Sequence, residues 1–189
     1  MAVFASGAGS NAQKIIDHFS DLSKNAVVSL LVSNNSKAGV LDIAEKANVA
    51  SLIIEKEQFF RGDSYVPFLK SKEIDLIVLA GFLWKIPQAL IDAYPRKIIN
   101  IHPALLPKFG GKGMYGSFVH QAVIDAKEKE SGITIHHVDE HYDHGDIIFQ
   151  ARCAVNSEDD TNSLSKKIHD LEHKHYPLII EQVLITVNA

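Results

Sequence analysis

The chain has 189 residues, of which 46% are hydrophobic and 22% charged, with a net charge of −4. This length and composition predict one domain, residues 1–189, that encloses a full hydrophobic core. The negative charge and the lack of a Lys/Arg block argue against nucleic-acid binding, and no run of about 18 apolar residues predicts a membrane helix.

Apolar runs of strand length alternate along the chain with segments of helical period. We expect strands at Ala2–Ala5, Val27–Val32, Ser51–Ile54, Asp75–Ala80, Lys97–Ile101, Gly132–Val138 and Ile147–Val155. Ala12, Ile15, Ile16 and Phe19 form a helical stripe, and further helices are expected over 38–47, 63–72, 87–94, about 117–128 and Thr161–Val183. The alternation predicts an α/β fold, a single Rossmann-like domain with a mostly parallel central sheet flanked by helices. The last two strands are expected to form an antiparallel C-terminal edge.

The first loop, Ser6–Asn11 (SGAGSN), joins a strand to a helix at the edge of the sheet where α/β proteins bind ligands. Gly7, Gly9 and Ala12 satisfy the loose dinucleotide pattern, but no acidic residue follows the second strand to hold a ribose, which argues against NAD. Gly9, Ser10 and Asn11 suit one small phosphate at a helix N-terminus. The alternative is a tight turn in which Ser10 or Asn11 is an ordinary N-cap.

The segment KIINIHPALLPK places Asn100 and His102 on one face of a strand, because alternate residues point the same way. Pro103 then ends regular pairing. An amide can donate to an oxyanion and an imidazole can carry a proton, so we interpret the pair as a candidate catalytic site. The alternative is a capped strand end with a satisfied histidine. A carboxylate beside His102 would raise its pKa. Asp139, Glu140, Asp143 and Asp146 are the candidates.

The single cysteine, Cys153, suits a reducing cytoplasm and is expected to be a buried strand residue and not a catalytic thiol. MAVFAS lacks the features of a signal peptide. Histidines raise the question of a metal site: His169 and His173 are four residues apart, and His136, His137, His141 and His144 lie in one segment. No H-E-x-x-H pattern occurs, so we expect surface or interface positions for most of them, and no metal.

Five motifs in order, namely SGAGSN, LAGFLWKI, NIHPALLPK, GITIHHVDEHYDHGDII and EHKHYPLII, resemble the phosphoribosylglycinamide formyltransferase family of the folate formyltransferase superfamily. The resemblance spans nearly the whole chain. It implies formyl transfer from 10-formyltetrahydrofolate, as co-substrate, to the amine of 5'-phosphoribosylglycinamide in de novo purine synthesis. It further implies small-molecule partners, a monomer or homodimer, a cytoplasmic location, and neither metal nor NAD.

The resemblance also implies roles for individual residues. Asn100, His102 and Asp143 match the catalytic set, with protonated His102 and Asn100 stabilising an oxyanion. Gly9, Ser10, Asn11 and Glu172 match the ribonucleotide site. Folate-binding positions are Arg61, Leu83, Trp84, Lys85, Ile86 and Asn100, with Arg61 as the nearest match to an arginine in the preceding helix. The loop Gly110–Gly116 is longer than in some members and is either a mobile flap or merely long.

Related activities differ in their expected domains. Methionyl-tRNA formyltransferases carry an additional RNA-binding domain, and formyltetrahydrofolate deformylases carry an additional regulatory domain. Sugar-nucleotide formyltransferases lack the SGxGSN loop in this form. A non-enzymatic nucleotide-binding module would have no use for Asn100, His102 and Asp143 together.

Overall fold

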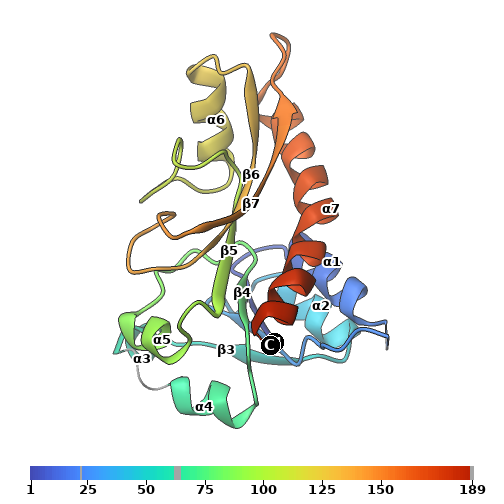
Figure 1. Ribbon diagram of the computed structural model, residues 1–189, viewed down its shortest axis with the longest axis vertical. Helices are drawn as coiled ribbons and strands as arrows, with labels where there is room; N and C mark the ends of the chain where they lie inside the picture. The colour runs from blue at the N-terminus through green and yellow to red at the C-terminus, as the bar shows by residue number, and fades with distance from the viewer. Residues whose placement is uncertain (22, 62–64, 188–189) are drawn as a thin grey trace.

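The computed structural model describes residues 1–21, 23–61 and 65–187. The strands of these residues form one seven-stranded sheet in the order β3-β2-β1-β4-β5-β6-β7 (Figure 1). The strands are β1 (Ala2–Phe4), β2 (Leu30–Ser33), β3 (Ala50–Ile53), β4 (Ile77–Leu79), β5 (Ile98–His102), β6 (Glu130–His137) and β7 (Ile147–Ala154). The first five are parallel, whereas β6 and β7 are antiparallel to their neighbours. This confirms the predicted α/β fold with its antiparallel edge.

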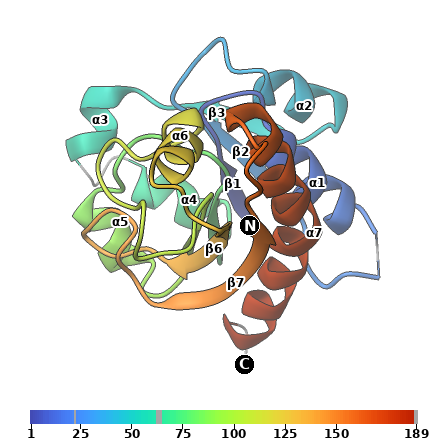
Figure 2. The same cartoon turned by 90° about the horizontal axis from the view of Figure 1, so that it is seen from above.

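Helices cover both faces of the sheet, and Figure 2 shows α1, α2 and α7 on one side with α3, α4 and α5 on the other. Their bounds are α1 (Ser10–Phe19), α2 (Val40–Lys46), α3 (Lys56–Arg61), α4 (Val66–Ser71), α5 (Gln88–Ala93), α6 (Ser117–Asp125) and α7 (Thr161–Val187). One core cluster lies beneath α1, α2 and α7 and the other beneath α3, α4 and α5. The inner parallel strands β1, β2, β4 and β5 are buried on both faces, which explains their apolar runs, whereas the edge strand β3 is largely exposed.

The predicted helical stripe is confirmed, since Ala12, Ile15, Ile16 and Phe19 are the buried residues of α1. The strand predictions are also confirmed, with ends shifted by a few residues. Val27, for example, precedes β2 and is 61% exposed. The helix expected over 63–72 appears as α4, although residues 63 and 64 lie outside the described part. Helix α3 was not expected, because its six residues are too few to show a helical period.

The strand order creates a natural binding crevice. From β1 the sheet continues through β2 and β3 on one side and through β4 and β5 on the other. The loops that follow β1 and β4 therefore diverge at the carboxyl edge, which is where open α/β sheets bind ligands. The carboxyl end of β5, with Asn100 and His102, lies beside this point. Among the described helices, none combines the length and apolar character needed to cross a membrane.

Candidate active site

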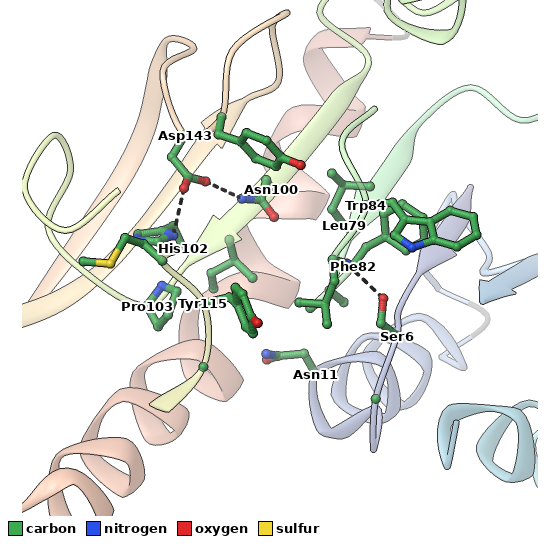
Figure 3. A pocket seen from close by; sticks show the side chains of 18 of the residues that line it. Ser6, Asn11, Leu79, Phe82, Trp84, Asn100, His102, Pro103, Tyr115 and Asp143 are labelled. Carbon is green, nitrogen blue, oxygen red and sulfur yellow. Dashed lines mark hydrogen bonds and ion pairs between the residues drawn. The ribbon is translucent and has the colours of Figure 1, made fainter. Parts of the chain in front are cut away.

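A cavity of about 740 Å³ opens at this carboxyl edge. Its lining comes from the loops after β1 and β4, the end of β5, residues 111–116, the β6–β7 loop and α7. The volume lies in the range of small-molecule sites. Figure 3 shows Asn100, His102 and Asp143 at one end of the cavity, with Asn11 at a distance from them.

The two polar residues of β5 occupy the face that the sequence predicts. Asn100 and His102 line the cavity, whereas Ile99 lies in the core beneath α1 and α7; Ile101 belongs to that core and also reaches the cavity lining. In the antiparallel ladder Asn100 lies opposite His136. The strand thus delivers an amide and an imidazole, two residues apart, to the same cavity wall.

Asp143 is the carboxylate that the fold brings to this pair. Its Oδ2 lies 3.5 Å from Nδ1 of His102, and its Oδ1 accepts a hydrogen bond of 3.4 Å from Nδ2 of Asn100 (Figure 3). The other candidates point elsewhere: Asp139 pairs with His144, Glu140 approaches His141 and Asp146 pairs with Arg96. The geometry therefore brings Asp143 to the pair, the carboxylate that the residue pattern alone left undecided and that the family resemblance implies.

His136 orients the amide of Asn100, a role that the sequence did not predict. Nδ1 of His136 lies 2.8 Å from the carbonyl oxygen of His137 and so must carry the proton that it donates. Nε2 of His136 is then an acceptor, 3.1 Å from Nδ2 of Asn100. His136 is an exception to the surface or interface positions expected for most of the histidines, because it is 2% exposed. The local sequence does not predict that His136 lies opposite Asn100 on the neighbouring strand.

The net pKa of His102 is lowered, which argues against the protonated His102 that the family resemblance implies. Burial is the largest cause, because His102 is 3% exposed. Asp143 and the carbonyl of Phe109, which lies 2.8 Å from Nε2, oppose this effect without reversing it. With Nε2–H donating to that carbonyl, a neutral His102 presents an unprotonated Nδ1 toward Asp143.

Asp143 itself is held ionised. Burial alone would raise its pKa, but the ring of His136, the proximity of His102 and the backbone N–H of Gly111 together lower it. That N–H donates to Oδ2 of Asp143 at 2.9 Å. A Cβ on Gly110 would lie 2.5 Å from Leu106 and 3.2 Å from the Cβ of Asp143. The chain can pass this close to Leu106 and Asp143 because residue 110 is a glycine. The loop Gly110–Gly116 thus contacts the carboxylate of Asp143 directly through the backbone of Gly111.

The loop after β1 presents an uncapped helix N-terminus to the cavity. Gly9 occupies the N-cap position of α1 with φ 85°, and no side chain caps the helix. The alternative of Ser10 or Asn11 as an ordinary N-cap is therefore not realised. A Cβ at Gly9 would lie 2.6 Å from Val40, so close packing of α2 as well as the positive φ requires glycine. Free backbone N–H groups and the helix dipole favour an anion at this point.

Glu172 reaches the same end of the cavity from α7. Nδ2 of Asn11 donates to its Oε2 at 2.8 Å, and Glu172 is 6% exposed. Burial raises the pKa of Glu172, although the bond from Asn11 opposes the shift. A buried carboxyl here can accept hydrogen bonds from hydroxyl groups of a ligand.

The segment after β4 supplies an apolar wall. Leu83, Trp84, Lys85 and Ile86 all line the cavity, and the backbone N–H of Leu83 donates to Oγ of Ser6 at 2.9 Å. Trp84 packs in an aromatic cluster with rings from α3. Arg61 is not brought to the site: it is absent from the lining, is exposed, and pairs with Glu57 one turn away. Its assignment to folate binding has no support in the geometry.

Comparison with known proteins gives the family. The model of the "Formyl transferase" family matches residues 1–180. The chain belongs to the formyl transferase family. The resemblance predicted from its motifs is therefore confirmed.

Two relatives and one solved structure within this family are similar to most of the chain. The chain is 37% identical to a phosphoribosylglycinamide formyltransferase of Bacillus subtilis, over 97% of this chain and 93% of that protein. It is 41% identical to the chloroplastic phosphoribosylglycinamide formyltransferase of Arabidopsis thaliana over 95% of its own length, but spans only 63% of that protein. A crystal structure of glycinamide ribonucleotide transformylase 1 from Geobacillus kaustophilus superposes with a TM-score of 0.88 at 35% identity, covering 97% of each chain.

Other reactive side chains of this formyl transferase lie outside the group formed by Asn100, His102 and Asp143. Cys153 is a half-buried residue of β7, and burial raises the pKa of its thiol, so it is a poor nucleophile. His120 lines the cavity but is 3% exposed, and burial is the main cause that lowers its pKa to about 4. Within the described residues, Asp139, His141 and His144 form one group with metal-ligand spacing, outside the Asn100–His102 pair.

Proposed function

We propose that this chain transfers a formyl group from 10-formyltetrahydrofolate to the amine of 5'-phosphoribosylglycinamide. The observation that carries the proposal is that the two ends of the cavity hold different functional groups. Asn100, His102 and the ionised Asp143 lie at one end, and the open N-terminus of α1 with Glu172 lies at the other. An acceptor with an anionic group at one end and an amine at the other fits this arrangement. The names of the relatives support the same reaction.

The residues suggest how the transfer proceeds. The free amine attacks the formyl carbon, and the carbonyl oxygen becomes an oxyanion. Asn100 donates to that oxyanion, with its weak 3.4 Å bond to Asp143 replaced by the new one while His136 keeps the amide oriented. The apolar wall formed by Leu83–Ile86 is suited to the donor's ring system. No step in this route needs a metal ion or a redox cofactor.

Because its pKa is lowered, His102 is proposed to act as a general base, and not as an acid that is protonated before the reaction. Neutral Nδ1 accepts the proton that the attacking nitrogen loses, and Asp143, 3.5 Å away, stabilises the imidazolium that results. His102 then returns this proton to the folate nitrogen as the carbon–nitrogen bond breaks. The products are the formylated amine and tetrahydrofolate, so atoms and charge balance.

One assay tests the reaction class. The purified chain is mixed with 10-formyltetrahydrofolate, and the folate absorbance is followed with and without phosphoribosylglycinamide. We expect release of the formyl group only when the amine is present. Release without the amine would indicate a hydrolase, and absence of release under both conditions would contradict the proposal.

The setting of the reaction is proposed as well. A reducing cytoplasm suits the single free thiol, small molecules suit the cavity, and the net negative charge does not favour nucleic acid. Residues 1–189 would act as a single domain, as a monomer or homodimer, and sedimentation of the purified chain measures which.

A further inference from the structure

The β6–β7 loop gathers three side chains whose donor atoms suit a metal ion. One ligand atom each from Asp139, His141 and His144 lies within 4.8 Å of the other two. Nδ1 of His144 is 2.8 Å from Oδ2 of Asp139, and the rings of His141 and His144 have centroids 5.3 Å apart. The described residues contain no second group of this kind.

The carboxylate of this group is held in place by the backbone. The N–H of His141 donates to Oδ1 of Asp139 at 2.8 Å, which leaves Oδ2 directed at His144. Glu140 adds a second carboxylate, with Oε1 3.7 Å from Nδ1 of His141. The two histidines are largely exposed, at 65% and 73% of their side-chain surface, so their rings are free to rotate inward.

The charge of the segment favours a cation. Residues 138–146 contain Asp139, Glu140, Asp143 and Asp146 and no lysine or arginine. Two imidazoles with one carboxylate match the preference of borderline transition ions, whereas Mg²⁺ and Ca²⁺ prefer oxygen ligands throughout. Zinc–nitrogen and zinc–oxygen bonds of about 2.0–2.2 Å are within reach once the exposed rings turn inward.

We propose that Asp139, His141 and His144 bind one divalent transition ion of the Zn²⁺ class. The ion is not part of formyl transfer. It closes the loop around Asp143, which lies between the two histidine ligands and adopts a left-handed backbone with φ 53°. A non-glycine residue in that conformation is strained, and a metal clip on both sides of it holds Asp143 near His102 and Asn100. Asp139 and His141 also line the cavity, so the ion lies at its mouth.

A second pair of histidines offers another position for a metal ion, and the experiment has to distinguish it from the proposed site. His169 and His173 are one helical turn apart on α7, with stacked rings whose centroids are 6.1 Å apart. Such a pair can chelate a transition ion by itself. His173→Gln removes this pair and is therefore the matched control for His144→Ala.

The experiment measures Zn²⁺ binding and thermal unfolding of the full, untagged chain, with Mg²⁺ as the reference ion. We expect one bound Zn²⁺ per chain, a rise in Tm with Zn²⁺ and no rise with Mg²⁺. His144→Ala and Asp139→Asn should each weaken Zn²⁺ binding by at least about tenfold and abolish the rise in Tm. His173→Gln should behave as wild type, and the metal-free Tm of each variant verifies its folding.

Three results would overturn the proposal: no Zn²⁺ binding by the wild type, unchanged affinity in His144→Ala, or loss of binding in His173→Gln. The last would transfer the site to α7. These measurements do not involve formyl transfer, so their outcome is independent of the proposed function.

Discussion

Replacing Asp143 by asparagine tests whether its charge assists proton transfer at His102. The substitution keeps the shape of the side chain and an oxygen for the N–H of Gly111, but removes the charge 3.5 Å from Nδ1 of His102. Both side chains are buried, at 11% and 3% exposure, so solvent screens the interaction little.

The expected magnitude follows from Coulomb's law. Two unit charges 3.5 Å apart interact by about 5 kcal/mol at an effective dielectric constant of about 20. If about half of the charge has developed on His102 in the transition state, the substitution removes about 2–3 kcal/mol of transition-state stabilisation. This corresponds to a fall in kcat of about 30- to 160-fold. The KM values should change little, because the charge on His102 appears only after binding.

The assay is steady-state formyl transfer, with Asp146→Asn as the matched control. Asp146 lies in the same loop and the substitution removes the same charge, but its partner is the exposed Arg96. We expect the control to retain kcat within about twofold, since exposed ion pairs contribute little. If Asp143→Asn retained kcat within about threefold while its Tm matched wild type, the reasoning would be refuted. An equal loss in both variants would refute it too, because the loop's charge and not the contact with His102 would then matter.

Three further predictions use the same assay or equilibrium unfolding. The lowered pKa of His102 keeps it neutral at neutral pH, so kcat/KM should fall only as pH drops below about 6.5, and a midpoint above that value would contradict a neutral base. Gly9→Ala, which forces a Cβ to 2.6 Å from Val40 at a positive φ, should lower the free energy of unfolding by about 1–3 kcal/mol in urea titration and raise KM for the ribonucleotide. Arg61→Ala should leave KM for the folate within about twofold, because Arg61 pairs with Glu57 outside the cavity, and a tenfold rise would restore its assignment.

The local sequence determined those features that depend on neighbouring residues. The period of two in β5 places Asn100 and His102 on one face, and Pro103 ends the strand, so the pair is recognisable from the amino-acid pattern alone. The apolar runs predicted every strand of the sheet, and the stripe from Ala12 predicted the buried face of α1. Motif order was sufficient to predict the family, because the spacing of SGAGSN, NIHP and the Asp143 segment carries that information.

The tertiary structure alone decided the features that depend on distant residues. Four carboxylates in one loop are equivalent by residue pattern, although the family resemblance implied Asp143, and the turn at Asp143 is what brings that carboxylate to His102. His136 acquires its role from antiparallel pairing with β5, which adjoining residues do not specify. The direction of the His102 pKa shift is set by burial, to which the whole chain contributes, and this outweighs the single neighbouring charge visible in the sequence. Burial and cross-strand contacts depend on residues that are far apart along the chain. Sequence patterns therefore predict which residues can act, whereas the fold decides which of them meet and in which protonation state.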